Sequence, residues 1–297
     1  YPMLARERGR HNVGPLLIRS RDPFGLARSD RQFAASTEVM VTPRIVPLPN
    51  WRQELAIGST GDATPLQLGA VGQDDTLVRE YRSGDDLRRV HWRTSARRGK
   101  LFVRREQQSW DPSVSLILDN RASRHTGKGR KGSFETAVST LASVALHLAN
   151  QRFYIDIRDV DGELPPAPIS DTDSLRAQIL GYATDVQMSQ TDSLTGATQA
   201  VVKSGSGDLV IAVLGRLDST DAGLLLRSRG RRQLGVALVM DTDTFTIRSL
   251  RATPEQKRDH QDAIKILREN KWRVVEIDNE ANLANSWQLL EMQPGAR

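Results

Sequence analysis

The chain of 297 residues is 38% hydrophobic and 26% charged, which excludes wholesale disorder and suits one large domain or two of ordinary size. It contains no cysteine, which excludes disulfides and cysteine nucleophiles, and no pair of histidines at ligand spacing, which disfavours a zinc enzyme. The net charge of +6 lies in the first third, because residues 1–110 hold 19 Lys and Arg against 12 Asp and Glu, whereas residues 111–297 hold 23 against 24. This asymmetry predicts an anionic neighbour for the first third, with a solvated arginine-rich surface as the alternative.

The start of the chain carries no apolar signal-peptide core, and its first residue is Tyr1 rather than Met. No run in the sequence approaches the roughly 18 consecutive apolar residues of a membrane helix. We therefore expect the chain as given to be soluble. A start at Tyr1 is what we expect of a fragment with a further part upstream.

Residues 13–46 consist of short extended runs broken by turn residues. Frequent proline disfavours helices and is typical of strand edges and turns. In and just after this segment proline stands at Pro15, Pro23, Pro43, Pro47 and Pro49. Residues 58–76 are rich in glycine and lack periodicity, so they predict a long loop, and residues 77–82 predict a strand. We therefore predict a small all-β domain over residues 1–110.

Residues 81–101, YRSGDDLRRVHWRTSARRGKL, gather arginines around Trp92. The pattern predicts a short helical run that ends at Gly99, followed by a strand. The arginines either hold phosphates or pair with local carboxylates and stack on Trp92, joining the two domains. Tyr81 and Trp92 are too few aromatic side chains for a single-strand nucleic-acid groove, so we predict a domain-joining scaffold.

From residue 114 the sequence alternates apolar strands with amphipathic helices. Strands are predicted over residues 114–119, 153–160, 208–215, 234–240 and 272–278. Helices are predicted over residues 133–151, 171–186, 218–232, 254–271 and 281–292. Near-continuous apolar strands between helices predict a mostly parallel sheet covered on both faces. We therefore predict a Rossmann-like α/β domain over residues 111–297, with its ligand site at the carboxyl ends of the strands.

The first of these strands ends at Asp119, in LILDNRASRH. An aspartate followed two and four residues later by hydroxyls would surround a hard cation with oxygen ligands. Ser123 supplies one hydroxyl, but Arg121 stands at the middle position, and a guanidinium has no lone pair to donate. The site is thus broken at one ligand, with Arg121 supplying the positive charge; bracing of the loop by Asp119 is the alternative. The segment around Asp218 is expected to converge on the same edge.

The loop GKGRKGS, residues 127–133, has two glycines at the separation found in phosphate-binding loops, Gly127 and Gly132. Ser133 and Phe134 follow where such a loop has Lys and then Ser or Thr. We therefore predict a flexible basic loop with Ser133 capping the next helix, rather than a nucleotide site.

A basic rim is expected at the same sheet edge, suited to an acidic protein surface. A solvated crossover without a partner is the alternative. The rim residues are Arg121, Arg124, Lys128, Arg130 and Lys131.

The arginine-rich segment carries a motif that resembles the bacterial domain-of-unknown-function family number 58. The motif, Arg-Glu-Tyr-x-x-Gly-Asp-Asp-x-Arg-x-x-x-Trp-x-x-Ser-Ala-Arg, is matched by Arg79, Glu80, Tyr81, Gly84, Asp85, Asp86, Arg88, Trp92, Ser95, Ala96 and Arg97. Residues 8–16, RGRHNVGPL, and residues 21–27, RDPFGLA, are similar to the upstream part of that family. The resemblance covers about residues 8–125 by motif and the remainder by architecture.

The resemblance implies a fold, an anchor and a partner. It implies that the α/β domain is of the von Willebrand factor A type, whose relatives carry a metal-ion-dependent adhesion site at the first strand. Here that site is degenerate at Arg121 and is left with Asp119, Ser123 and Asp218, so no cofactor beyond weakly bound Mg²⁺ is expected. The resemblance further implies two membrane helices upstream, with this part in the cytoplasm, and a MoxR-type AAA+ ATPase as partner in assembling or activating other proteins.

Three functions follow from these observations. The first is a non-enzymatic protein-interaction module that works with such an ATPase. The second is binding of nucleic acid or anionic lipid through the basic first third. The third is a phosphoesterase or nucleotide-binding enzyme that uses Asp119 and the loop 127–133. Neither a Ser/His/Asp arrangement nor a Gly-x-Ser-x-Gly motif is visible, so we do not expect an enzyme.

Overall fold

The computed structural model describes most of the α/β part and portions of the first third. The described residues are 4–5, 7–33, 35–50, 78–80, 95–97, 99–104, 113–161, 172–204, 209–230, 233–247 and 251–293. Internal contacts divide the chain into two compact units, Tyr1–Gly58 with Pro112–Arg297, and Ser59–Asp111. This division joins the first 58 residues to the α/β part, whereas the sequence grouped them within residues 1–110.

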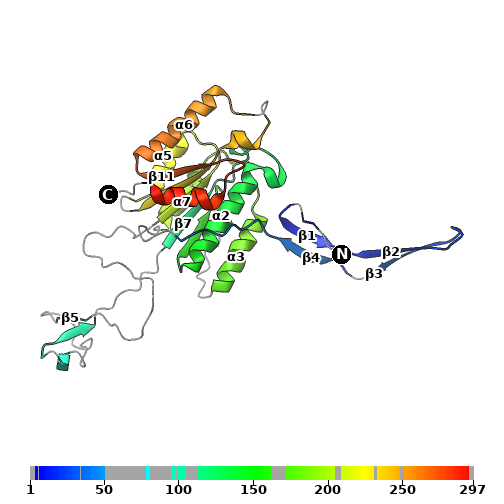
Figure 1. The fold of residues 1–297 in the computed structure, drawn as a ribbon, viewed down its shortest axis with the longest axis horizontal. Coiled ribbons are helices and arrows are strands. Elements are labelled where there is room, and N and C mark those ends of the chain that lie inside the picture. Colours follow the sequence, from blue (N-terminus) through cyan, green and yellow to red (C-terminus); the bar gives the residue numbers. More distant parts are fainter. Residues whose placement is uncertain are drawn as a thin grey trace. The chain divides into compact units, whose positions relative to one another are not determined.

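A five-stranded parallel sheet forms the centre of the larger unit (Figure 1). Its strands are β7 (Ser113–Leu118), β8 (Tyr154–Arg158), β9 (Leu209–Leu214), β10 (Leu234–Met240) and β11 (Trp272–Ile277), in the order β11-β10-β9-β7-β8. All residues of β9 are buried. This is what its continuous apolar sequence predicted, because such a strand belongs in a sheet that is covered on both faces. The predicted Rossmann-like α/β fold is therefore confirmed.

Within the described residues, six α-helices cover the two faces of this sheet. They are α2 (Ser133–Asn150), α3 (Thr172–Asp185), α4 (Thr195–Lys203), α5 (Ser219–Ser228), α6 (Pro254–Glu269) and α7 (Leu283–Met292). One core contains buried residues of α2, α3 and α7, and the other contains those of α4, α5 and α6. The strands alternate between the two cores, since Leu116 belongs to the first and Ile117 to the second.

Two separate antiparallel pairs precede the sheet. β1 (Gly9–Val13) pairs with β4 (Thr37–Val41), and β2 (Leu16–Arg21) pairs with β3 (Arg28–Phe33) in a hairpin (Figure 1). Among the described residues up to position 50, only Pro43 is buried. This part therefore contributes strands without a hydrophobic core of its own, and an all-β domain over residues 1–110 stays a prediction.

The segment after β4 packs on the helices of the larger unit instead of forming a strand. Ile45, Val46 and Leu48 lie against the core of α2, α3 and α7. The backbone nitrogen of Val46 donates to Ser143 Oγ at 2.9 Å, and Trp287 Nε1 donates to the carbonyl of Pro49 at 3.2 Å. The prolines of this segment suit such an extended cover, because they need no ladder partner.

The smaller unit contains a short antiparallel pair, β5 (Val78–Glu80) with β6 (Phe102–Arg104). Residues 95–97 are helical, and Gly99, whose φ is 67°, donates its backbone nitrogen to the carbonyl of Ser95 at 3.0 Å. The predicted strands and the stop at Gly99 are thus confirmed. The motif residues Tyr81, Gly84, Asp85, Asp86, Arg88 and Trp92 lie outside the described residues.

Candidate functional site

The candidate site lies at the carboxyl edge of the sheet, between β7 and β9. The chain runs from β7 to β8 on one side and then crosses to β9 on the other, so the strand order reverses between β7 and β9. Open α/β sheets bind ligands at such a point. Asp119 follows β7 and Arg216 follows β9, which brings the two loops predicted from the sequence to one edge.

Arg121 occupies the centre of this edge, clamped between two carboxylates. Its Nε and Nη2 donate to the two oxygens of Asp119 at 2.8 and 2.9 Å. Its Nη1 and Nη2 donate to the two oxygens of Asp221 at 2.8 and 3.1 Å. Arg121 and Asp119 are fully buried, so the planar guanidinium forms two bidentate pairs away from water.

Asp221 is held in place by the start of α5. Asp218 is the N-cap residue: its Oδ1 accepts from the backbone nitrogen of Asp221 at 2.9 Å, and Asp221 Oδ2 accepts from that of Asp218 at 3.2 Å. Asp218 was predicted from the sequence to lie at this edge, whereas Asp221 was not. The spacing of the two aspartates in DSTD is that of a capping box, which was the available signal.

The two carboxylates beside Arg121 titrate differently. Burial alone raises the pKa of Asp119, but the hydrogen bonds and charge of Arg121 outweigh it, so the pKa lies below its ordinary value. Burial raises the pKa of Asp221 above its ordinary value, and the guanidinium of Arg121 only partly opposes this. Burial lowers the pKa of Arg121, yet the two carboxylates more than compensate and raise it. Arg121 is therefore a permanent cation with Asp119 as its principal counter-ion.

The residues of the degenerate adhesion site expected from the sequence are engaged in other contacts. Asp119 accepts four hydrogen bonds, from the backbone nitrogen, Nε and Nη2 of Arg121 and from the backbone nitrogen of Gly215. A carboxylate has about four acceptor positions, so Asp119 has none left for a metal. Ser123 is exposed, and Asp218 bonds Arg124 and its own helix. Within the described part of the chain, no three His, Asp or Glu side chains are grouped as ligands.

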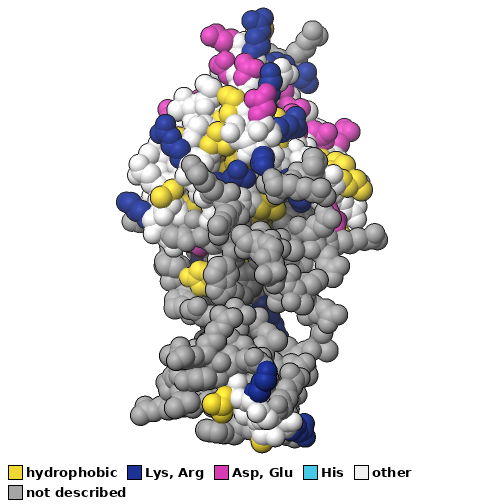
Figure 2. All heavy atoms as spheres, turned by 90° about the vertical axis from the view of Figure 1, so that its left-hand side faces the viewer, with side chains coloured by type: hydrophobic (Ala, Val, Ile, Leu, Met, Phe, Trp, Pro, Cys, Tyr) yellow, Lys and Arg dark blue, Asp and Glu magenta, His cyan; other side chains and the backbone are white. Residues whose placement is uncertain are grey.

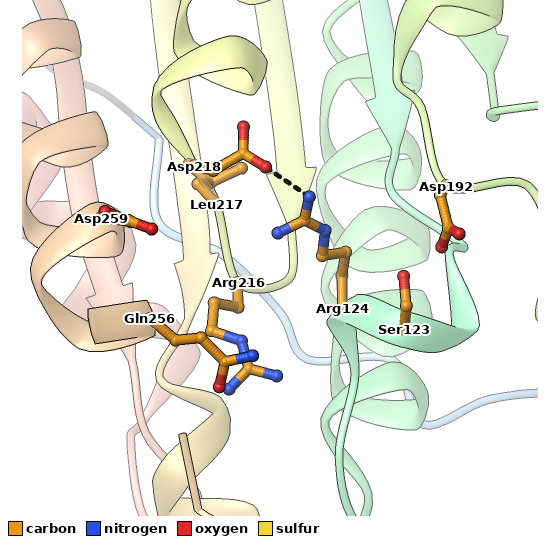
Figure 3. Close-up of a pocket in the computed structure, with 8 residues that line it drawn as sticks. All are labelled: Ser123, Arg124, Asp192, Arg216, Leu217, Asp218, Gln256 and Asp259. Atoms are coloured by element: carbon orange, nitrogen blue, oxygen red, sulfur yellow. Dashed lines mark hydrogen bonds and ion pairs between the residues drawn. The ribbon is translucent and has the colours of Figure 1, made fainter. Parts of the chain in front are cut away.

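Asp119, Arg121 and Asp221 are together called the clamp. A hollow of about 390 Å³, drawn in Figure 3, opens beside it. Its lining comes from four segments: the 3-10 turn Ala122–Arg124, the loop before α4, the loop from β9 to α5, and α6. The lining residues are Ser123, Arg124, Asp192, Arg216, Leu217, Asp218, Gln256 and Asp259. Figure 3 shows Arg124 bonded to Asp218. Within the described residues the Arg216 side chain makes no hydrogen bond, and burial lowers its pKa. The hollow thus has a lining of mixed charge, in which Arg216 shares the space with Asp192 and Asp259.

The two loops at this edge approach so closely that one position requires glycine. A Cβ on Gly215 would lie 2.4 Å from the carbonyl oxygen of Arg124. That same oxygen accepts a hydrogen bond from the backbone nitrogen of Arg216 at 3.0 Å. The clamp residue Asp119 also accepts from Gly215, so the strand ends and the hollow form one connected structure.

The predicted basic rim needs one correction. Arg121 is buried between its carboxylates and is not part of an exposed rim. Lys128, Arg130 and Lys131 are exposed on and beside the 3-10 turn Gly129–Lys131, and Arg124 is half-buried. Three of the five predicted residues are therefore exposed.

Ser133 also differs from its predicted role. Gly132 is the N-cap residue of α2 and no side chain caps this helix, so Ser133 does not. Its Oγ accepts from the backbone nitrogen of Thr126 at 2.9 Å and lies 3.0 Å from His125 Nδ1. His125 Nε2 in turn donates to the carbonyl of Asp119 at 2.6 Å. The serine thus closes the basic loop onto the strand end that carries the clamp.

Comparison with known proteins supports the family resemblance. The model of a family described as "Protein of unknown function DUF58" matches residues 77–156, which include the arginine-rich motif, β7, the clamp residues Asp119 and Arg121, and α2. Neither curated proteins nor solved structures gave a significant match. Over residues 77–156, the chain is thus confirmed to resemble the DUF58 family.

Proposed function

We propose that this chain is a non-enzymatic protein-interaction module that docks an acidic partner at the carboxyl edge of its sheet. The observation that carries the proposal is the clamp of Asp119, Arg121 and Asp221. It places a fixed guanidinium where a bound cation would otherwise organise the edge, and it uses the carboxylates for internal bonds. A surface held in this way is preorganised for binding without a metal.

The charges around the clamp favour an acidic partner. Lys128, Arg130 and Lys131 are exposed, whereas the adjoining hollow is lined by acidic as well as basic side chains. By contrast, in the upper part of Figure 2 the described Lys and Arg side chains are interspersed with Asp and Glu. Clustered exposed cations steer an anionic partner during encounter.

The carboxylates at the edge are poor candidates for catalysis. Asp119 is fully buried with four donors around it, and Asp218 bonds Arg124 and caps α5. A general base must reach a substrate proton, and a nucleophile must be exposed to a reacting atom. This supports an interaction role over the phosphoesterase alternative.

As partner we propose a MoxR-type AAA+ ATPase, and as fold type a von Willebrand factor A-like domain, both on the strength of the family resemblance. The same resemblance underlies our proposal that the full-length protein is anchored in a membrane with this part in the cytoplasm. In the described part of the chain, none of the helices has the length and apolar character needed to cross a bilayer.

The test is charge reversal at the exposed cations. The variant Lys128→Glu/Arg130→Glu/Lys131→Glu is expected to associate with a purified MoxR-type ATPase about tenfold or more slowly at low salt, measured by surface plasmon resonance, because steering charges act on the association rate. Its melting temperature should barely change, since exposed substitutions shift stability by about 0.5 kcal/mol or less.

The matched control reverses three exposed cations near the carboxyl ends of helices, Lys203→Glu/Arg227→Glu/Lys265→Glu. Those positions lie toward the opposite edge of the sheet, because each helix runs back from the carboxyl edge. An equal loss of rate in both variants would show that only net charge matters, and unchanged rates in both would place the interface elsewhere.

A further inference from the structure

The hairpin of β2 and β3 exposes apolar side chains that the described part of the chain does not cover. Every residue of both strands is exposed, and in the turn between them Phe24 and Leu26 are 85% and 88% exposed. An isolated two-stranded hairpin is only marginally stable in water. Adjacent exposed apolar side chains of this size mark a contact surface.

The turn holds these side chains outward by its own hydrogen bonds. The Asp22 carboxylate accepts from the backbone nitrogens of Phe24 and Ala27 at 3.3 and 2.7 Å. The backbone nitrogen of Gly25, whose φ is 72°, donates to the carbonyl of Asp22 at 3.0 Å. Asp, Pro and Gly at these positions specify a tight turn, so the exposure of Phe24 and Leu26 follows from local sequence.

Positive charge in excess of the nearby carboxylates flanks the exposed pair. Arg21 and Arg28 face each other across the last rung of the ladder before the turn. Asp30 accepts from both Arg19 and Arg28, and Asp22 is used by the turn backbone. In the described residues Arg21 has no ion pair. Like charges directly opposite each other are destabilising, so an external anion at this rung would stabilise the hairpin.

We propose that this turn docks on an anionic lipid membrane. Phe24 and Leu26 enter the boundary between headgroups and acyl chains, while Arg21 and Arg28 contact lipid phosphates. Exposed apolar and aromatic side chains beside arginines are typical of surfaces that bind the interface between water and an anionic membrane. The turn is convex, and a bilayer accepts a convex apolar tip without a matching pocket. A nucleic-acid site would use stacking aromatics, and a leucine as exposed as Leu26 has no ring face to stack.

The experiment is vesicle flotation of the full 297-residue chain. We expect binding to phosphatidylcholine vesicles that contain phosphatidylserine and little binding to pure phosphatidylcholine. Phe24→Ser/Leu26→Ser and, separately, Arg21→Glu/Arg28→Glu should each weaken binding about tenfold or more. All four positions are exposed, so the variants should fold normally.

Matched controls separate the turn from general surface character. Leu289→Ser/Met292→Ser removes exposed apolar side chains from α7, where they are 52% and 80% exposed, and Lys203→Glu/Arg227→Glu reverses two distant charges. Both controls should bind as the unmodified chain does. If they weaken binding as much as the turn variants, the proposal is wrong.

The absence of cysteine allows a direct readout of insertion. A single Phe24→Cys carrying an environment-sensitive dye should shift its emission to the blue on anionic vesicles, whereas Met292→Cys should not. Vesicle binding without that shift would overturn the proposal. Two other results would also overturn it: binding of single-stranded DNA or RNA in place of vesicles, or dimer formation in sedimentation in place of vesicle binding. In either case the Phe24→Ser/Leu26→Ser variant should lose the interaction. No ATPase is present in these assays, so their outcome is independent of the docking proposal.

Discussion

At the scale of the residue, Arg121 organises the carboxyl edge of the sheet. It satisfies Asp119 and Asp221 with two bidentate pairs in a buried position. Removing one partner of a buried ion pair typically costs about 3–5 kcal/mol, because the remaining charges lose their compensation. The same arginine that blocks a cation is thus also what makes the buried carboxylates tolerable.

We expect isothermal calorimetry to give no saturable heat when Mg²⁺ is added to the unmodified chain. Arg121→Ser frees acceptor positions on Asp119 and adds a hydroxyl, so this variant should be less stable by about 3–5 kcal/mol and should be stabilised by Mg²⁺. Arg124→Ser is the control, since it removes a guanidinium from Asp218 and leaves Asp119 saturated. Micromolar Mg²⁺ binding to the unmodified chain, abolished by Asp119→Ala, would contradict the expectation.

His125 predicts a pH dependence of stability. Burial lowers the pKa of His125 below its ordinary value, against the opposing charge of Asp119. The unfolded chain, with a pKa near 6.5, therefore takes up protons before the folded one does. The stability contributed by neutral His125 is present above about pH 6.5 and is lost as the pH falls.

Urea unfolding at pH 7 and pH 5 measures this effect. The unmodified chain should lose stability between the two values, and His125→Gln should lose less of it. Burial also lowers the pKa of His147 and His260, so part of the loss should remain in the variant. An identical loss in both proteins would exclude His125 as a contributor.

At the scale of the element, the sequence predicted what depends on local periodicity. β10 and the starts of α2 and α6 fall at their predicted residues, because apolar runs and Pro254 fix them locally. Helix α4 was missed, since TGATQAVVK is short and contains Gly, Thr and two Val, all weak helix formers. Its burial of Ala197 and Val201 against the sheet stabilises it instead.

The clamp shows the same division between local and long-range information. The replacement of a cation by Arg121 was predicted from spacing around Asp119 alone. Asp221, which is 100 residues from Arg121, enters the clamp only through the fold. The burial of Arg121 could not be predicted either, because it requires the loop from β9 and the start of α5 to close over it.

At the scale of the whole molecule, the beginning of the chain is attached to the α/β part by buried polar contacts. Arg8 Nε donates to Glu135 Oε2 at 2.8 Å, and its Nη1 donates to the carbonyl of Ala183 at 2.8 Å, with only 6% of the side chain exposed. The guanidinium also lies over the ring of Phe134, 5.3 Å from its centroid. Together with the cover formed by residues 43–50, these contacts account for the grouping of residues 1–58 with 112–297.

This grouping predicts that the larger unit survives loss of the smaller one. With protease sites introduced near residues 59 and 111, cleavage should leave residues 1–58 bound to residues 112–297 during size-exclusion chromatography. Arg8→Ala should weaken that association by about 1–3 kcal/mol, since it leaves Glu135 half-buried without its partner. Arg19→Ala, on the exposed hairpin, is the control and should have no effect. If residues 1–58 separate from the α/β part on cleavage, the contacts of Arg8 and of residues 43–50 are too weak to hold these segments in one unit. The predicted boundary between residues 110 and 111 would then describe the domains better.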